Sequence, residues 1–162
     1  MLASAATRAF ATAAAPRILI TGACGQIGTE FVTLLRKKYG VENVIASDLR
    51  FPNREFQLSG PSAFLDVTDK ANITRLVAEN GITWIIHLGA LLSAIGEKMP
   101  QKALEVNVHG SENIIDVARQ YKCRLYIPST IGAFGPSTPK EMTPDETIMR
   151  PTTMYGVSKV HL

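Results

Sequence analysis

The sequence predicts an α/β protein built on a doubly wound parallel sheet with the strand order 3-2-1-4-5. Short apolar runs alternate along the chain with longer amphipathic segments, which is typical of parallel strands joined by crossover helices. The runs are almost continuously apolar, as strands covered on both faces are. Because such crossovers are right-handed, the alternation leads to this strand order.

The first predicted strand follows Arg17 and runs into a glycine-spaced turn. Gly22, Gly25 and Gly28 form a G-x-x-G-x-x-G pattern. Glycines at these positions allow a sharp turn and a close approach of a pyrophosphate to the backbone. A helix that begins near Gln26 directs its free N–H groups to the same place. A purely structural strand-to-helix turn is the alternative.

The second predicted strand, residues 44–47, ends at an acid. Asp48 follows Gly28 by twenty positions, where a carboxylate can bond an adenosine ribose and repel a 2′-phosphate. Together with the glycine turn, Asp48 predicts a dinucleotide site that prefers NAD to NADP. Arg50 lies near enough to soften that preference.

The remaining elements follow in order. The first helix has an apolar face of Ile27, Phe31, Leu34 and Leu35 and ends at Gly40. A polar connection is expected over 49–61, a short strand over 63–65, a helix from a cap at Asp69 to Glu79, and a buried strand over 83–88.

Further along, a helix that begins at Pro100 is expected, because proline is tolerated in a first turn. Its broad apolar face is formed by Leu104, Val108, Ile114, Ile115 and Ala118. A fifth strand is expected over 124–127, a long loop over 131–150, and a last helix from Met154.

Composition sets the class of protein. The chain has 162 residues, 46% of them hydrophobic, which suits one globular domain over 17–162. A net charge of +3 without a basic run argues against nucleic acid as a partner. Cys24 and Cys123 lack metal-site spacing and are expected to be free thiols, and no metal is predicted. No apolar run reaches the length of a membrane span, so no membrane partner is predicted.

The first sixteen residues differ from the rest. They are rich in Ala, Ser and Thr, contain Arg8 and Phe10, and have no acidic residue. This composition predicts a mitochondrial transit peptide, ahead of a plastid one. A disordered Ala-rich tail is the alternative.

Tyr155 and Lys159 form a Y-x-x-x-K pair, which places both side chains on one face of a helix. A lysine ammonium stabilises a nearby phenolate, so that Tyr155 can act as a general base. The hydroxyl of Thr130, at the carboxyl end of the fifth strand, can bond a substrate oxygen beside it. An ordinary surface pair is the alternative interpretation of the motif taken alone.

Three other polar residues have simpler interpretations. His87 lies within an apolar strand and is expected to be a core histidine. Cys24 faces the glycine turn, where a small side chain suffices. Asn107 is expected to bond the backbone near the sheet.

With these motifs in place, the chain resembles the extended short-chain dehydrogenase/reductases, of the sugar-epimerase-like branch with a Rossmann fold. Three stretches, 91–94, 128–135 and 151–161, are similar to those of the short-chain L-threonine 3-dehydrogenases of mitochondria. The resemblance covers 16–162 and implies NAD-dependent oxidation of L-threonine to 2-amino-3-oxobutanoate, in threonine catabolism towards glycine. It also implies a homodimer in the mitochondrial matrix.

The resemblance assigns roles by position. Tyr155 is the base, Lys159 holds the nicotinamide ribose and tunes Tyr155, Thr130 replaces the usual serine, and Ser93 grips the substrate. The pyrophosphate would lie on the glycine turn, the ribose near Asp48, the adenine near Asp66 and the rest of the cofactor after the fourth strand. The cofactor residues are Gly22, Ala23, Cys24, Gly25, Gln26, Ile27, Gly28, Asp48, Leu49, Arg50, Asp66, Val67, Leu88, Gly89, Ala90, Tyr155 and Lys159.

Two other functions share these features. A nucleotide-sugar epimerase or dehydratase uses the same glycine turn, Asp48 and the Tyr155–Lys159 pair. Because the chain stops one turn into a helix, we also expect the NAD-binding domain to be incomplete, truncated before the substrate-binding part. An inactive NAD-binding fragment is therefore the third hypothesis.

Overall fold

A computed structural model describes residues 15–50 and 53–162, so that almost all of the expected leader lies outside the described residues. Five parallel strands form one sheet in the order β3-β2-β1-β4-β5, as predicted. The strands are β1 (Ile18–Thr21), β2 (Val44–Asp48), β3 (Ser62–Phe64), β4 (Trp84–His87) and β5 (Arg124–Tyr126).

Helices connect the strands and follow the last one. The α-helices are α1 (Gln26–Tyr39), α2 (Arg54–Leu58), α3 (Lys70–Glu79), α4 (Ser93–Gly96), α5 (Pro100–Ala103), α6 (Gly110–Gln120) and α7 (Met154–His161). Two 3₁₀ turns, η1 (Val41–Asn43) and η3 (Ile131–Ala133), and one π-helical segment, η2 (Leu104–His109), complete the described elements.

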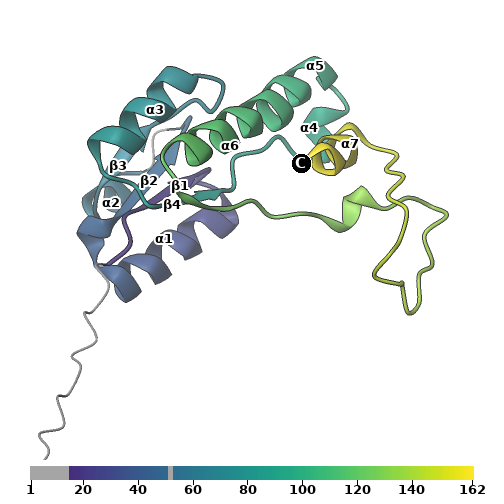
Figure 1. Cartoon of the computed structure of the whole chain (residues 1–162), viewed down its shortest axis with the longest axis horizontal. Helices are drawn as coiled ribbons and strands as arrows, with labels where there is room; N and C mark the ends of the chain where they lie inside the picture. Colours follow the sequence, from purple (N-terminus) through teal and green to yellow (C-terminus); the bar gives the residue numbers. More distant parts are fainter. Residues whose placement is uncertain (1–14, 51–52) are drawn as a thin grey trace, which may run out of the picture.

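Helices cover both faces of the sheet. In Figure 1, α3 and α6 lie on one face and α1 on the other. Alternate residues of β1 serve the two sides: Leu19 packs in the cluster that includes Ile73 of α3, and Ile20 in the cluster that includes Val32 of α1. The double covering explains why all four residues of β1 are buried.

The buried face of α1 agrees only in part with the predicted one, since Phe31 and Leu35 pack against the core. Ile27 and Leu34 are 59% and 60% exposed, whereas Val32 and Arg36 are buried. Arg36 takes this place because its guanidinium donates to Ser59 Oγ and Pro61 O, each at 2.5 Å. These bonds satisfy a charge that could not otherwise be buried, and they tie α1 to the chain leading into β3.

The predicted helix from Pro100 is continuous but changes its winding. It begins as α5, passes through the π-helical η2 and continues as α6. Val108, Ile114 and Ala118 are buried as predicted, whereas Ile115 is 37% exposed and Val117 fills the core instead. A π-helical stretch adds residues to a turn, and so shifts the face that later residues present to the sheet.

Two surface features were not predicted. The connection over 49–61, predicted only as a polar connection, contains α2, which Asn53 caps by accepting a bond from Phe56 N at 2.8 Å. One face of β4 and β5 carries a hollow of about 390 Å³ lined by apolar and aromatic side chains and Arg124. No helix among the described residues has the length and apolar character needed to span a membrane.

Candidate functional site

The predicted site residues gather at the carboxyl edge of the sheet. Because β1, β2 and β4 are parallel, Thr21, Ser47 and His87 lie in register at that edge. The loops that follow these strands therefore leave the sheet side by side. This edge is where ligands bind in open parallel sheets.

The glycine turn after β1 fits closely against the loop after β4. Gly22 has a φ of +72°, and a Cβ on it would lie 2.6 Å from Gly89 N. A Cβ on Gly28 would lie 2.4 Å from Gly22 O. Both positions therefore require glycine, the first for its conformation and both for their close approach.

The turn is a suitable cradle for a phosphate. Helix α1 begins at Gln26 after the N-cap residue Gly25, which has no side chain to bond the first turn. The N–H groups of that turn are thus open to an external acceptor, at the positive end of the helix dipole. The residues present fit the pyrophosphate of a dinucleotide.

Asp48 is fixed at the mouth of this turn. Its Oδ2 accepts from Cys24 N at 2.9 Å, and its Oδ1 accepts from Arg50 N at 2.9 Å. The Arg50 guanidinium is 3.5 Å from Oδ1 and its side chain is 68% exposed. The carboxylate is thus held beside the turn, where it can still accept bonds from ribose hydroxyls.

The loop after β3 presents Asp66 and Val67. Asp66 Oδ1 accepts from Thr68 N at 2.9 Å and from Thr68 Oγ1 at 2.7 Å. These two bonds lower the pKa of Asp66 below its usual range. Asp66 is therefore an ionised acceptor at neutral pH.

The loop after β4 is held by Asn107. Leu91 N donates to Asn107 Oδ1 at 2.7 Å, and Asn107 Nδ2 donates to Leu91 O at 2.9 Å. This pair of bonds confirms the expected contact of Asn107 with the backbone. The preceding residue Leu88 remains attached to β1, because its N–H donates to Thr21 O at 3.0 Å.

Tyr155 and Lys159 lie on α7, next to the turn that contains Thr130. The Lys159 ammonium is 6.0 Å from the centre of the Tyr155 ring, and it donates to Pro128 O at 3.2 Å. Burial lowers the pKa of Lys159. A Cβ on Gly132 would lie 3.8 Å from Tyr155 Cδ1, so the phenol ring lies against the Thr130–Gly132 turn.

Thr130 has a structural bond of its own. Its Oγ1 accepts from Gly132 N at 3.1 Å and so caps η3. A hydroxyl that accepts one bond can still donate its proton. Thr130 can therefore serve both the turn and a substrate oxygen.

Residues that sequence reasoning missed hold α7 in place. Glu97 Oε1 accepts from Met154 N at 2.5 Å, at the start of α7. Ser158 is fully buried; its Oγ donates to Tyr155 O at 2.7 Å and receives a bond from Asn107 Nδ2 at 3.2 Å. Glu97 is distant in sequence from the start of α7, so no local pattern predicts its contact. Ser158 lies inside the Y-x-x-x-K motif, and its position there was a signal that could have been used.

Ser93 begins α4, in the short segment that ends at Glu97. Glu97 binds the first turn of α7, so the structure brings this segment next to the helix that carries Tyr155. The role of Ser93 towards a substrate stays a prediction.

His87 is a core histidine, as expected. It is 2% exposed; its Nδ1 lies 2.6 Å from Thr21 Oγ1 and its Nε2 lies 3.1 Å from Ser111 Oγ. Burial, with a smaller contribution from the positive charge of Lys159, lowers the pKa of His87 to about 4. The ring is therefore neutral at physiological pH and links β1 to α6.

The two cysteines are free, and burial raises the pKa of each thiol. Within 15–50 and 53–162, no group of three or more His, Cys, Asp or Glu residues could hold a metal ion.

Comparison with known proteins places these features in a family. Residues 18–162 match the model of the "NAD dependent epimerase/dehydratase family". A pig protein named "L-threonine 3-dehydrogenase, mitochondrial" is 50% identical over 152 residues, which are 94% of this chain and 41% of the pig protein. A human protein named "Inactive L-threonine 3-dehydrogenase, mitochondrial" is 51% identical over 146 residues, 90% of this chain and 64% of the human protein.

A solved structure is similar as well. The X-ray structure of L-threonine dehydrogenase from Clostridium difficile superposes with a TM-score of 0.87 at 45% sequence identity. The match covers 90% of this chain and 46% of that chain. This chain therefore spans less than half the length of the pig protein and of the solved structure.

Proposed function

The chain belongs to the NAD dependent epimerase/dehydratase family, and on that premise we propose that it forms the cofactor-binding and catalytic part of an NAD-dependent L-threonine 3-dehydrogenase. The observation that carries the proposal is the placement of Tyr155. Its ring lies against the Thr130 turn, with the Lys159 ammonium 6.0 Å away, at the ligand-binding edge of the sheet.

The glycine turn and Asp48 support NAD as the cofactor. Gly22 and Gly28 keep the cradle clear of side chains, and the start of α1 offers N–H groups to the pyrophosphate. Asp48 would hold the adenosine ribose, with Leu49 and Arg50 beside it. Asp66 and Val67 would line the adenine, and Leu88, Gly89 and Ala90 the rest of the cofactor.

In the proposed reaction Tyr155 removes a proton from the β-hydroxyl of threonine. When bound, the oxidised nicotinamide supplies a hydride acceptor. The O–H and C–H bonds of the β-carbinol break, a C=O bond forms, and 2-amino-3-oxobutanoate results. Lys159, whose ammonium lies 6.0 Å from the centre of the Tyr155 ring, would hold the nicotinamide ribose. The Thr130 hydroxyl donates a hydrogen bond to the substrate oxygen, and Ser93 contacts the amino acid.

Replacement of the phenol tests the proposed base. In a form of the protein that oxidises threonine, Tyr155→Phe should lower kcat by about 10² to 10⁴ and leave the Kd for NAD within a few-fold. Tyr121→Phe is the matched control, because Tyr121 lies at the end of α6, 36% exposed. If Tyr155→Phe keeps kcat within a few-fold of the unaltered protein, another group is the base.

The two other functions stay open to test. A nucleotide-sugar epimerase or dehydratase is favoured by the family name, which covers epimerases and dehydratases, and would use the same residues. An NAD-binding protein without turnover is favoured by the human relative that is named inactive.

One experiment separates the three. Residues 17–162 are purified, NAD binding is measured by calorimetry, and the chain is incubated with NAD and either L-threonine or UDP-glucose. NADH formation with threonine supports the dehydrogenase, and conversion of the sugar nucleotide supports the epimerase. Binding without either reaction supports the inactive protein, and no binding overturns all three.

The cellular setting is also a proposal. The composition of residues 1–16 and the name of the pig relative support a transit peptide and the mitochondrial matrix. The homodimer stays a prediction, which sedimentation analysis of the full-length protein would test.

A further inference from the structure

Ser93 and Glu97 lie on one turn of the chain that follows β4. Glu97 N donates to Ser93 O at 2.9 Å, at the end of α4. Residues four apart on a helical turn lie on the same side of it. The turn is anchored, because Leu91 just before it both donates to and accepts from the side-chain amide of Asn107. The residue expected to grip the substrate and Glu97 therefore belong to one fixed unit.

This unit lies against the first turn of α7. A Cβ on Gly96 would lie 3.9 Å from Tyr155 N, an ordinary van der Waals distance. Next along the chain, Glu97 Oε1 accepts from Met154 N at 2.5 Å. An amide at the start of a helix has no acceptor within its own helix, so a bond from another element both satisfies it and fixes the helix end. Glu97 thus connects the Ser93 turn to the residue immediately before Tyr155.

Two neighbouring elements place the first turn of α7. Gly156 allows the turn to pack directly on η3, whose cap is Thr130. Glu97 bonds the same turn to α4. The first contact places Tyr155 relative to the group proposed to bond the substrate oxygen, and the second places it relative to Ser93.

We propose that Glu97 is a positioning residue that fixes the start of α7 to the Ser93 turn, so that a threonine held by that turn presents its β-hydroxyl to Tyr155. The proposal rests on the proposed function, because it requires Tyr155 to be the base and Ser93 to contact the substrate. Glu97 acts through the Met154 N–H and need not contact substrate or cofactor.

Three replacements of Glu97 separate the hydrogen bond from the charge. The side chain is exposed, so its replacement leaves no cavity in the core. Glu97→Gln keeps the length and an acceptor oxygen but loses the charge. Glu97→Asp keeps the charge but is shorter by a methylene group, and Glu97→Ala loses both. If the hydrogen bond places Tyr155, only Glu97→Gln should behave like the unaltered protein.

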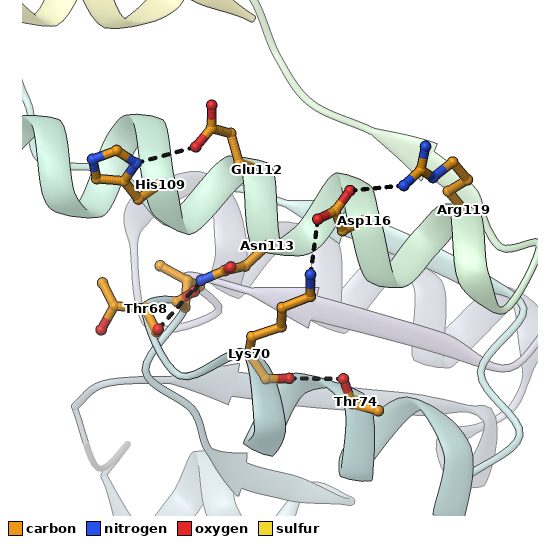
Figure 2. A network of polar contacts seen from close by, with 9 residues as sticks. Thr68, Lys70, Thr74, His109, Glu112, Asn113, Asp116 and Arg119 are labelled. Carbon is orange, nitrogen blue, oxygen red and sulfur yellow. Dashed lines mark hydrogen bonds and ion pairs between the residues drawn. The ribbon is translucent and has the colours of Figure 1, made fainter.

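Glu112 offers a matched control at the other end of α7. Its Oε1 lies 3.1 Å from His161 Nε2, and its Oε2 lies 3.1 Å from His109 Nδ1. Figure 2 shows Glu112 on α6, with its carboxylate directed towards His109. The Glu112 side chain is 48% exposed. Glu112→Ala thus also removes an exposed carboxylate that contacts α7, but leaves the first turn of the helix bonded.

The first measurement uses this chain with 3-fluorotyrosine in place of its four tyrosines and records fluorine NMR spectra. The signal that Tyr155→Phe removes identifies Tyr155. We expect Glu97→Ala and Glu97→Asp to shift or broaden that signal, and Glu97→Gln and Glu112→Ala to leave it unchanged. The other three signals should stay in place in every variant.

The second measurement uses a form of the protein that oxidises threonine. Displacement of a reacting group by about 1 Å can cost about 10²-fold in rate, so we expect Glu97→Ala and Glu97→Asp to lower kcat by about tenfold or more. KM for threonine and Kd for NAD should stay within a few-fold, because Asn107 still holds the chain before Ser93 and the glycine turn is unaltered. Glu97→Gln should restore kcat, and Glu112→Ala should not lower it.

A role in overall stability alone predicts something else. Glu97→Ala would then lower the thermal midpoint but leave the Tyr155 signal and the kcat of the folded protein unchanged, and this result overturns the inference. Equal effects of Glu97→Ala and Glu97→Gln also overturn it, because the charge and not the hydrogen bond would be responsible. If Tyr155→Phe keeps kcat, the proposed function fails, and the fluorine signal alone decides whether Glu97 places Tyr155.

Discussion

At the scale of single residues, we expect Asp48 to set the preference of the proposed site for NAD or NADP. Its two oxygens are fixed by Cys24 N and Arg50 N, so the negative charge cannot turn away from a 2′-phosphate. We expect NAD to bind more tightly than NADP. Asp48→Asn should narrow the ratio of their Kd values by about tenfold or more, because the substitution removes the negative charge that strengthens the bond to the ribose and repels a 2′-phosphate. Calorimetry with both dinucleotides measures this ratio.

The neighbouring arginine provides the control for Asp48. Arg50 is exposed and can attract a 2′-phosphate, so Arg50→Ala should widen the preference for NAD. Tighter binding of NADP than of NAD by the unaltered chain would show that Asp48 does not face the ribose.

His87 makes stability depend on pH. Its pKa is about 4 in the folded chain and near 6.5 when exposed. Between these values the unfolded chain binds a proton that the folded chain does not. The contribution of His87 is therefore fully present above pH 6.5 and is lost as the pH falls towards 4. The slope is at most about 1.4 kcal/mol per pH unit.

Chemical denaturation between pH 7.5 and 5 measures this effect. His87→Gln should flatten the dependence of the unfolding free energy on pH, whereas His109→Gln, which alters an exposed side chain, should not. The lowered pKa of Asp66 affects stability only at lower pH, because its usual value is 3.8. An equally steep dependence in His87→Gln would assign the slope to other groups.

At the scale of elements, the placement of α7 depends on its first turn. Thr153 Oγ1 accepts from Gly156 N at 3.0 Å and caps the helix. A Cβ on Gly156 would lie 2.2 Å from Gly132 O, so α7 packs directly on η3. A shift of this turn would move Tyr155 relative to Thr130.

Loss of the cap should loosen α7. Thr153→Ala is expected to lower stability by about 1 kcal/mol and to speed hydrogen exchange of the α7 amides. Thr153→Ser retains the hydroxyl and should restore protection. Thr152→Ala is the neighbouring control, because Thr152 is exposed. Equal exchange rates in Thr153→Ala and the unaltered chain would show that the cap does not hold the helix.

The elements that the sequence predicted well are those with strong local patterns. The apolar strands, the glycine turn and the Asp69 cap are all present, and Asp69 Oδ1 accepts from Asn72 N at 3.0 Å. The missed elements depend on distant partners. Helix α2 is five residues long, too short for a periodic pattern. Arg36 is buried because it bonds backbone carbonyls of other elements, and no local sequence pattern predicts those contacts.

The site was predictable to a similar extent. Parallel strands bring their carboxyl ends together, so the gathering of Gly22, Asp48 and Leu88 follows from the strand order alone. The contacts that hold the neighbouring loop and helix do not follow from it. Asn113 bonds Thr68 O, 45 residues away in sequence, and Glu97 bonds Met154 N at the start of α7, 57 residues away.

At the scale of the whole molecule, the hollow on β4 and β5 is an exposed apolar surface. Tyr126 is 51% exposed and stacks on Phe31 with their ring centres 6.5 Å apart. Surfaces of this kind promote association. Sedimentation velocity should show self-association of residues 17–162 that rises with concentration.

Introducing a charged side chain into the hollow tests whether the hollow forms the contact in this association. Tyr126→Lys should shift the chain towards the monomer, whereas Tyr121→Lys, at the end of α6, should not. Association that persists unchanged in Tyr126→Lys would place the contact elsewhere.

The central position of β1 also imposes an order on biosynthesis. The turn after β1 is confined by Gly89, and Thr21 is bonded to His87, a residue 66 positions later. At about 5–20 residues per second, a ribosome needs roughly 3–13 seconds to add that stretch. During this interval the nascent chain acquires β2 and β3, but the glycine turn still lacks the loop after β4 that confines it. The cofactor can therefore assist only the later steps of folding, after β4 has left the exit tunnel.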